Sequence, residues 1–549
     1  MGILAHGVRA ESVAMRAGGL ALLGVAAFAA HAAELPPEIG RVLTGHAIPA
    51  TDVSIVVQGV DDSKPLLSHL ADQARSPASV MKTVTTWSAL EYLGPAYTWR
   101  TEVYFLGQFD GEKLDGDLGI KGYGDPQLVV EEVWKLLRAL RRMGLKEITG
   151  DLVLDDSYFA IDEPEPGAFD GQPYRTYNVV PNALMMNFKA VQFQFMPDPA
   201  RGRVNVSTDP VLANLQIDNN LALVDGPCGG YNAGISFDHA DGDSLEHVVL
   251  GGKFSRRCNV YTLGRTVLQH DTFAYGMFTS LWKEVGGSFA GKLRKAPIPA
   301  DATPALVWRS KPLGEIVRSI NKNSNNVMTR QLLYTLGAEG AGAPGTRENG
   351  VTVVRDLLKT RGLDASSLML QNGAGLSRDE RASMQFLADL LRAAYASPYA
   401  PEFIASLSLG GLDGTTRGRF DSSEPSQVMH LKTGRLDHVS AVAGYVHASN
   451  EKTYVVAVVM NSPDAHRGPG QELEEAVLRY TLAQSKPRAG AGPVVTSTAP
   501  SGPVSVLPPD PTSETPSDPA PATPSGPVSA PLSVPVSAPP SAPVSTPLP

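Results

Sequence analysis

The sequence contains little cysteine, no excess of positive charge and no apolar run long enough to span a bilayer. Its 549 residues include two cysteines, and 47 Lys and Arg residues are outnumbered by 56 Asp and Glu residues, a formal net charge of -9. This charge argues against nucleic acid as a partner. The string His-Glu-x-x-His is absent and the 11 histidines are scattered, which argues against a zinc peptidase. We therefore expect no metal and no cofactor.

The N-terminus has the pattern of a secretory signal peptide. Arg9 and Arg16 precede an apolar stretch at residues 17–30, and Ala30-His31-Ala32 fits a cleavage site. The pattern predicts a signal peptide over residues 1–32 and an exported chain. An uncleaved anchor is the alternative, although the apolar stretch is short for a membrane span.

Export would place both cysteines in an oxidising compartment. Cys228 and Cys258 have no third cysteine to compete with, so a disulfide between them is the natural prediction. By loop-closure entropy the disulfide would stabilise the fold by roughly 3–4 kcal/mol. Two buried free thiols are the alternative.

Composition and periodicity divide the chain into several parts. Strand-like segments near both ends and helical segments after residue 305 predict one sheet built from both ends of the folded chain. The stretch from 99 to 300 is typical of an insertion with its own strands. A Pro/Ser/Ala-rich end predicts a disordered tail, either a spacer or binding arm or an idle solvated segment. The expected parts are a first domain of 33–98 with 301–485, an inserted α/β domain of 99–188 with 263–300, a β-rich subdomain of 189–262, and a tail of 486–549.

Three short strings carry the chemistry: Ser79-Val80-Met81-Lys82, Ser324-Asn325-Asn326 and Lys432-Thr433-Gly434. They match S-x-x-K, S-x-N and K-T-G, the parts of a serine acyl-transferase that β-lactams trap. Their context has to select them, because S-x-x-K also occurs at Ser280 and Ser319, and S-x-N also occurs at Ser319. K-T-G occurs once.

Ser79 has the best context for a nucleophile. It follows Pro77-Ala78 at the start of a predicted helix, where the helix dipole and a free N–H favour an oxyanion. Lys82 lies on the same helix face, within reach of the hydroxyl. Burial and a second cation, Lys432, would lower the pKa of Lys82 so that it serves as a base. The alternative role for Ser79 is a simple helix cap.

The other two strings supply a proton relay and a substrate strand. Ser324 can pass a proton to a leaving amine, and Asn326 can hold Lys82 and the substrate amide; a helix N-cap is the alternative. Lys432 and Thr433 would bind a carboxylate, and Gly434 would let a substrate backbone lie against the strand. The N–H of Arg435 would be a second oxyanion donor. A strand end with a turn glycine is the alternative.

As a set, the strings resemble the penicillin-binding, active-site-serine D,D-peptidases. The spacing from Ser79 to Ser324, 245 residues, is similar to that of the class C low-molecular-mass penicillin-binding proteins, the D-Ala-D-Ala carboxypeptidase/endopeptidase family. Further strings fit the same family: Gly124-Asp125-Pro126, Gly150-Asp151-Leu152, Asn372-Gly373-Ala374-Gly375-Leu376-Ser377 and Leu412-Asp413-Gly414-Thr415.

The resemblance implies an α/β (α+β) fold: a catalytic domain with an antiparallel five-stranded sheet flanked by helices, and a two-domain insertion. It implies a periplasmic serine enzyme that cleaves D-Ala-D-Ala bonds or D-Ala-diamino acid cross-links of peptidoglycan stem peptides and is acylated by β-lactams. Attachment to membrane or wall and the oligomeric state stay open. A β-lactamase or esterase of the same fold and a non-catalytic wall-binding protein are the alternatives.

The chain departs from the family pattern at two positions. Arg435 stands where the family often has Thr or Ser, so a hydroxyl near the substrate carboxylate is missing. Its side chain either faces away from the site or replaces the hydroxyl with a charge contact. Ala374 stands where the family often has Ser, which we interpret as a tolerable change.

Overall fold

The computed structural model describes residues 35–228, 235–240, 246–420 and 426–485. Contacts group Met1–Pro487 into one unit and Arg488–Pro549 into another. The predicted signal peptide and the predicted disordered tail lie outside the described residues. Within the described residues, no helix is both long and apolar enough to cross a membrane.

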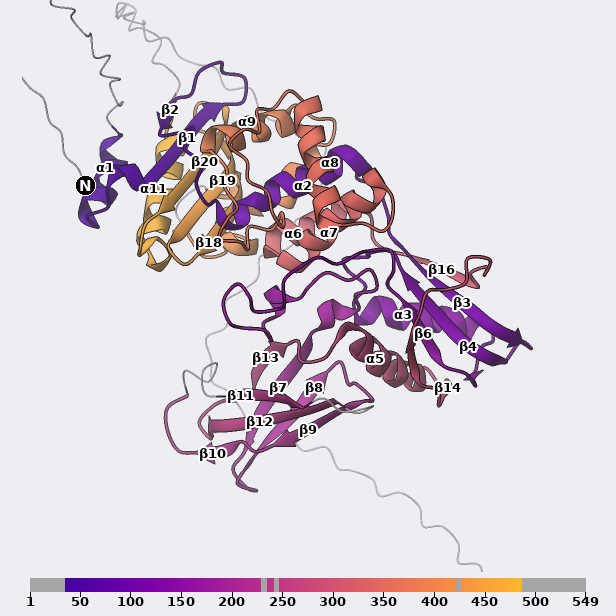
Figure 1. Cartoon of the computed structure of the whole chain (residues 1–549). Coiled ribbons are helices and arrows are strands. Elements are labelled where there is room, and N and C mark those ends of the chain that lie inside the picture. The colour runs from indigo at the N-terminus through magenta and orange to yellow at the C-terminus, as the bar shows by residue number, and fades with distance from the viewer. Residues whose placement is uncertain (1–34, 229–234, 241–245, 421–425, 486–549) are drawn as a thin grey trace, which may run out of the picture. The chain divides into compact units, whose positions relative to one another are not determined.

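Strands from both ends of the folded chain share one antiparallel sheet, as predicted (Figure 1). Its order is β17-β18-β19-β20-β1-β2, so the described residues form six strands where five were expected. The difference lies at the edges, where β17 and β2 pair over only two or three residues. The strands are β1 (Val53–Gly59), β2 (Leu67–His69), β17 (Ser408–Leu409), β18 (Met429–Leu436), β19 (Val439–His447) and β20 (Thr453–Asn461).

Helices cover both faces of this sheet because its central strands are apolar on both sides. Along β1, Val53, Ile55 and Val57 pack into one cluster, while Val56 packs into the opposite one. This is the alternation that a strand buried on two faces requires. One face meets α1 (Pro37–Gly45) and α11 (Pro469–Leu482). The other meets α2 (Lys82–Leu93), α6 (Leu313–Asn323), α7 (Asn326–Ala341), α8 (Arg347–Thr360), α9 (Met384–Tyr395) and α10 (Ala400–Ser406).

The inserted residues form three further sheets and a core of their own. Seven strands pair around β3 and β4, and α3 (Val130–Arg142) and α5 (His270–Glu284) contribute to the same core. The seven are β3 (Arg100–Phe109), β4 (Lys113–Gly122), β5 (Glu147–Ile148), β6 (Leu152–Asp155), β14 (Ser288–Phe289), β15 (Leu293–Lys295) and β16 (Leu306–Arg309).

The β-rich part of the insertion contains the other two sheets, in the orders β13-β7-β8 and β10-β12-β11 with β9 beside β12. Cys228 and Cys258 form a disulfide there, with 5.0 Å between their Cα atoms. The strands are β7 (Val191–Asp198), β8 (Arg203–Asp209), β9 (Leu215–Asn219), β10 (Ala222–Val224), β11 (Ile235–Ala240), β12 (Glu246–Ser255) and β13 (Tyr261–Arg265). β13 runs across the expected boundary between 262 and 263, and this part shares one apolar core with the rest of the insertion.

Short 3-10 turns complete the fold and include the turn that carries Ser79. They are η1 (Ala50–Asp52), η2 (Ala78–Met81), η3 (Thr176–Asn178), η4 (Asn187–Lys189), η5 (Gly414–Thr416), η6 (Ser426–Val428) and η7 (Ala465–Arg467).

The insertion holds α7, the helix that follows the S-x-N string. The Arg330 side chain donates to the Val179 carbonyl at 2.9 Å and pairs with Glu163 at 3.0 Å, both side chains being almost fully buried. Gln331 donates to the Asn182 carbonyl at 2.6 Å. A buried ion pair with additional hydrogen bonds is costly to break, so the insertion constrains the position of α7.

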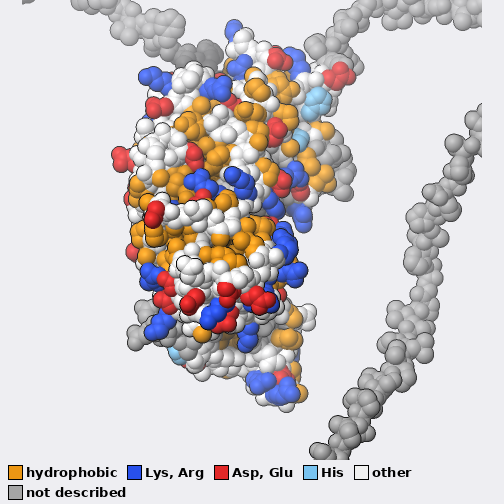
Figure 2. All heavy atoms as spheres, turned by 90° about the vertical axis from the view of Figure 1, so that its right-hand side faces the viewer, with side chains coloured by type: hydrophobic (Ala, Val, Ile, Leu, Met, Phe, Trp, Pro, Cys, Tyr) orange, Lys and Arg blue, Asp and Glu red, His pale blue; other side chains and the backbone are white. Residues whose placement is uncertain are grey.

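Acidic and basic side chains are interspersed with apolar ones on the face that Figure 2 shows. A continuous basic surface, as nucleic-acid binding needs, is not formed on this face.

Candidate active site

Ser79 lies in the tight turn η2, directly before α2. The N-cap of this turn is Pro77, and no side chain caps it. The Ser79 hydroxyl instead accepts a hydrogen bond from Lys82 Nζ at 2.9 Å. Of the two roles considered for Ser79, the geometry favours the nucleophile over the cap. The predicted helix start is correct in place, but its first turn is 3-10.

Lys82 is fully buried, and its Nζ contacts three groups of the site. Besides Ser79, its Nζ donates to Asn326 Oδ1 at 2.5 Å and to the Ala374 carbonyl at 2.5 Å. Burial lowers the pKa of Lys82 well below its ordinary value, and the nearby charge of Lys432 lowers it further. A lysine with such a lowered pKa can take the proton of a serine hydroxyl.

The S-x-N string places two side chains in the cleft because its middle residue caps the next helix. Ser324 ends α6 in the left-handed conformation, with φ of 53°. Asn325 is the N-cap of α7, and its side chain accepts from the Met328 N–H at 3.0 Å. The cap role weighed for this string therefore belongs to Asn325, which leaves Ser324 and Asn326 for the site.

Lys432 comes from β18 and is buried behind Ser324. Its Nζ donates to Ser324 Oγ at 2.9 Å and to the Thr433 carbonyl at 2.7 Å. Burial lowers the pKa of Lys432 to about 7. The hydroxyl of Thr433 donates to the Thr415 hydroxyl at 2.7 Å. Lys432 and Ser324 thus form a second amine–hydroxyl pair, and Ser324 lines the same pocket as Ser79.

Two glycines let other segments approach the turn that carries Ser79. A Cβ on Gly434 would lie 2.4 Å from the Pro77 carbonyl oxygen and 3.0 Å from the Ser79 nitrogen. A Cβ on Gly375, whose φ is +79°, would lie 1.9 Å from the Ala78 oxygen. The missing side chain of Gly434 therefore makes room for η2 of the same chain, a neighbour that the sequence did not indicate.

The edge of β18 beside Ser79 is available to a substrate. Among the described strands, β17 pairs with β18 only at His430 and Leu431. The Gly410 N–H donates to the Met429 carbonyl at 3.0 Å, so odd-numbered residues of β18 direct their backbone groups to this edge. The Arg435 N–H therefore points to the open edge, where the sequence placed the second oxyanion donor.

The competing copies of the motifs have other surroundings. Ser280 and Lys283 lie on α5 in the insertion. Lys322 donates to Asp413 Oδ2 at 2.5 Å, and Asn321 donates to Ser406 Oγ at 2.8 Å. These side chains bind structural partners, and none of them lines the pocket that contains Ser79.

Sequence reasoning missed Glu380, whose side chain is 1% exposed. Its Oε1 accepts backbone N–H groups of Gln371, Asn372 and Gly373, and its Oε2 accepts that of Gly375, all at 2.7–2.9 Å. These bonds shape the loop whose Ala374 carbonyl holds Lys82. Position 374 contributes this carbonyl, which any residue supplies, so alanine in place of the family's serine keeps the contact.

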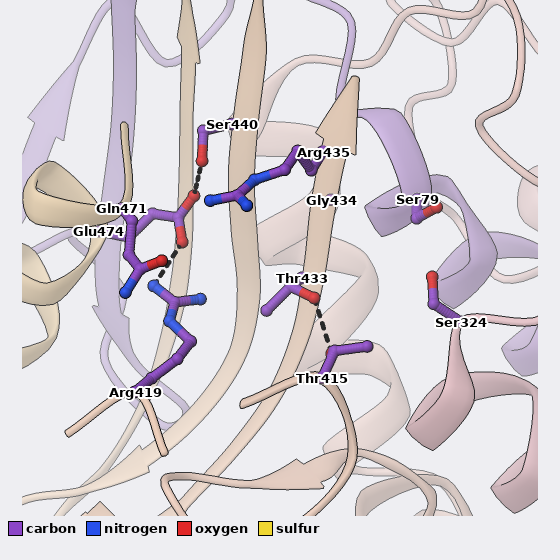
Figure 3. Close-up of a pocket in the computed structure, with 10 residues that line it drawn as sticks. All are labelled: Ser79, Ser324, Thr415, Arg419, Thr433, Gly434, Arg435, Ser440, Gln471 and Glu474. Atoms are coloured by element: carbon purple, nitrogen blue, oxygen red, sulfur yellow. Dashed lines mark hydrogen bonds and ion pairs between the residues drawn. The ribbon is translucent and has the colours of Figure 1, made fainter. Parts of the chain in front are cut away.

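A pocket of about 310 Å³ opens between Ser79, Ser324 and β18 (Figure 3). Beyond Thr433 and Arg435 it reaches Ser440 on β19, Arg419, and Gln471 and Glu474 on α11. The sequence analysis assigned no role to these last four residues. They lie far apart in the chain and match no motif, so only the fold identifies them as neighbours.

The comparisons with known proteins agree with this geometry. The sequence model of the D-Ala-D-Ala carboxypeptidase 3 (S13) family matches residues 36–479. The chain belongs to this family. It is a hydrolase of the D-Ala-D-Ala carboxypeptidase type, in agreement with the prediction from the strings.

Two curated relatives of this S13 chain illustrate the similarity. A D-alanyl-D-alanine carboxypeptidase of Actinomadura sp. strain R39 is 27% identical, covering 82% of this chain and 85% of the relative. The D-alanyl-D-alanine carboxypeptidase DacB of Haemophilus influenzae is 23% identical, covering 74% of this chain and 85% of the relative.

A solved structure, penicillin binding protein 4 (dacB) of Haemophilus influenzae, has the same fold. It superimposes with a TM-score of 0.69 at 20% identity, covering 81% of this chain and 99% of that one. The expected fold class is thereby confirmed.

Proposed function

We propose that this S13 chain cleaves peptidoglycan stem peptides through an acyl-enzyme on Ser79. The observation that carries the proposal is the hydrogen bond of 2.9 Å between Lys82 Nζ and Ser79 Oγ. Asn326 binds the same Nζ, and the Lys432–Ser324 pair contributes Ser324 to the same pocket. A serine bound to a lysine of lowered pKa has the arrangement of an activated nucleophile.

In the first step, neutral Lys82 accepts a hydrogen bond from the Ser79 hydroxyl, the reverse of the donation made by the charged lysine, and takes its proton while the Ser79 oxygen attacks the D-Ala carbonyl. The developing oxyanion faces the N–H groups of Ser79 and Arg435. The C–N bond then breaks, Ser324 Oγ donates a proton to the departing amine, and the proton that Lys82 took from Ser79 is passed on to Ser324, which leaves Lys82 neutral again. Because Lys432 already donates to Ser324 Oγ, the Ser324 O–H is left free for this donation.

In the second step, water attacks the ester carbonyl and neutral Lys82 accepts a proton from the water. As the ester C–O bond breaks, Lys82 gives this proton to the Ser79 oxygen, which restores the hydroxyl and the neutral lysine. A β-lactam would open on Ser79 in the same way and leave a stable ester.

A β-lactamase of the same fold is less well supported. It needs a base for fast deacylation of the ring-opened ester, and Glu474 is the only carboxylate among the described residues lining the pocket. Glu474 accepts from Ser440 at 2.5 Å and pairs with Arg419 at 2.8 Å. A carboxylate held by these two donors is poorly placed to activate water.

The proposed place of action is the periplasm, after export by the N-terminal segment. Supporting this, residues 17–30 have the apolar character of a signal peptide, and the Cys228–Cys258 disulfide suits an oxidising compartment. Cell fractionation with an antibody to the chain tests the location, and recovery in the cytosol alone would contradict it.

Covalent labelling with a fluorescent penicillin tests the site. We expect the wild type and the Ser280→Ala variant, which alters a second S-x-x-K serine, to label equally, and Ser79→Ala to remain unlabelled. Mass spectrometry of digested muropeptides then separates loss of terminal D-Ala from cleavage of cross-links. Labelling of Ser79→Ala at the wild-type level would refute the assignment.

A further inference from the structure

A second pocket, of about 310 Å³, lies directly beside the one that contains Ser79, because Ser324 lines both. We call it the side pocket. The catalytic domain contributes residues 323–327 to it, and the insertion contributes Thr176, Tyr177, Phe188, Ala190 and Gln192. A substrate bound at Ser79 therefore lies next to side chains of the insertion, to which the proposed mechanism assigns no role.

The side pocket differs from its neighbour in charge. None of the described residues that line it is acidic or basic. The pocket around Ser79, in contrast, is lined by Arg419, Arg435 and Glu474, and the Arg435 side chain there extends toward Glu474 and away from Ser79 (Figure 3). Burying a charge without a partner is costly, so the side pocket disfavours the carboxylates and the free amine of a stem peptide. Its chemistry suits an uncharged part of the substrate.

Tyr177 gives the side pocket an aromatic ring that is fixed but accessible. Its hydroxyl donates to Asp170 Oδ2 at 2.7 Å, which holds the ring, and the residue keeps 37% of its surface exposed. Phe188, half-buried, is a second ring of the lining and packs against the cluster that contains Val327. Small-ligand sites commonly combine such rings with a few polar groups. An exposed ring face can pack against the apolar C–H face of a sugar ring.

A strained turn holds Phe188 in the lining. Asn187, Phe188 and Lys189 have φ values of 44°, 55° and 53°. This left-handed conformation is unfavourable for residues with a side chain, and three of them in succession without a glycine are uncommon. The Asn187 side chain closes the turn by donating to the Ala190 carbonyl at 3.0 Å. Backbone strain of this kind concentrates where it orients a functional side chain, which here is the Phe188 ring.

Primary amides form the polar part of the lining. Asn325 accepts the α7 capping bond with its Oδ1, which leaves its Nδ2 as a donor. Asn323 donates through Nδ2 to the Ser319 carbonyl at 3.2 Å, which leaves its Oδ1 as an acceptor. Gln192 is exposed on β7, and its side chain has no hydrogen-bond partner within the described part of the chain. These groups can match both the N–H and the carbonyl of an acetamido group.

We propose that the side pocket binds an N-acetylated sugar of the glycan strand to which the stem peptide is attached. The inference rests on the proposed function, because it names a further part of the same substrate. These sugars are uncharged where the peptide is linked to them, and they carry acetamido groups and apolar ring faces. The four residues between the scissile bond and the sugar span at most about 14 Å, which suffices to reach an adjoining pocket. The volume lies at the low end of the range for small-ligand sites, about 300–1,000 Å³, and suits one sugar ring.

The test compares two pentapeptide substrates that differ only at the N-terminus. One carries the N-acetylglucosaminyl-N-acetylmuramyl disaccharide, and the other carries an N-acetyl group, so that neither has a charged N-terminus. For the wild type we expect kcat/KM to be about tenfold higher on the disaccharide substrate, equivalent to about one net hydrogen bond, with the difference in KM. In Tyr177→Ala this advantage should fall below about twofold, while kcat/KM on the sugar-free substrate stays at the wild-type value.

Three further variants sharpen the test. Tyr177→Phe keeps the ring and should keep most of the advantage, and Gln192→Ala should lose part of it. Tyr395→Ala removes a tyrosine that is 39% exposed at the end of α9 and does not line the side pocket, so it should behave as the wild type. Saturation labelling with penicillin, which carries no sugar, counts the intact sites in each preparation, so a misfolded fraction cannot imitate a change in specificity.

The outcomes separate the two proposals. A wild type that cleaves neither substrate and forms no penicillin adduct would refute the proposed function, and the sugar site with it. An active wild type without a preference for the disaccharide substrate would refute the sugar site alone. The same holds if Tyr177→Ala keeps the full preference, or if it is impaired equally on both substrates, which would place the peptide rather than the sugar against Tyr177.

Discussion

Replacing Glu380 with glutamine removes one buried charge from the loop that holds Lys82 without changing the size of the side chain. Burial raises the pKa of the Glu380 carboxyl, while its four backbone N–H donors act in the opposite direction. Both oxygens face donors only, so the geometry favours the ionised form. In Glu380→Gln the amide nitrogen replaces one oxygen and faces an N–H group that it cannot accept.

The magnitude follows from these four bonds. One buried N–H loses its acceptor, at a cost of about 1–3 kcal/mol, and the remaining bonds lose their ionic acceptor. Removing a buried charge also relieves its desolvation, which offsets part of the loss. We expect the free energy of unfolding to fall by about 2–4 kcal/mol, measured by urea denaturation. Asp379→Asn, which changes the exposed neighbouring acid, is the matched control and should stay within about 0.5 kcal/mol of the wild type.

Glu380→Gln should also shift the pH dependence of penicillin acylation, which a loss of stability alone would not do. The Glu380 charge raises the pKa of Lys82, so removing it lowers that pKa further. The acid limb of the rate of penicillin acylation should therefore move to lower pH. The maximal rate of acylation should fall about tenfold, because a displaced Ala374 carbonyl would weaken its hydrogen bond to Lys82. An acid limb at the wild-type pH, together with a stability equal to that of Asp379→Asn, would refute this reasoning.

Three other perturbations have defined outcomes. Burial lowers the pKa of Lys432 to about 7, so its positive charge is present below that pH and lost above it. KM for a carboxylate substrate should therefore rise as the pH passes through about 7. In Lys432→Arg, which keeps its charge, KM should stay nearly constant over the same pH range. In Gly375→Ala the new methyl group would meet the Ala78 oxygen, so acylation of Ser79 should be nearly abolished. Gly342→Ala, also at positive φ but with open space around it, is its control. Replacing both Cys228 and Cys258 with Ser should lower the free energy of unfolding by about 3 kcal/mol, measured by urea denaturation, and leave penicillin acylation unchanged.

Each of these expectations has a contradicting result. A wild-type KM that stays constant between about pH 6 and 9 would show that Lys432 does not titrate there. Acylation of Gly375→Ala at the rate of Gly342→Ala would mean that η2 tolerates the added methyl group. Unchanged stability of the double serine variant would mean that the disulfide does not constrain the unfolded chain.

The three candidate strings could be found from the sequence because the residues within each string lie close together in the chain. Ser79 and Lys82 lie three residues apart at a helix start, and Lys432 with Thr433 lies on one strand, so spacing alone places these side chains. The spacing between the strings and the added matches led to the right family and fold class.

The close neighbour of Gly434 was missed because it is remote in sequence. From the sequence alone, a glycine on a strand edge indicates space for a ligand. The fold also places η2 against this glycine. Glu380 was missed for a related reason: its partners are backbone N–H groups, which any sequence supplies.

The amino-acid sequence by itself determined the candidate groups for the chemistry, because a serine with its lysine, or a serine with its asparagine, needs particular residue types at short spacing. Only the tertiary structure decided what surrounds them. The contact of Lys82 with the Ala374 carbonyl and the pairing of Arg419 with Glu474 depend on segments that are far apart in the chain. Burial and charge contacts of this kind set pKa values and specificity, and they exist only once the sheet and helices have packed.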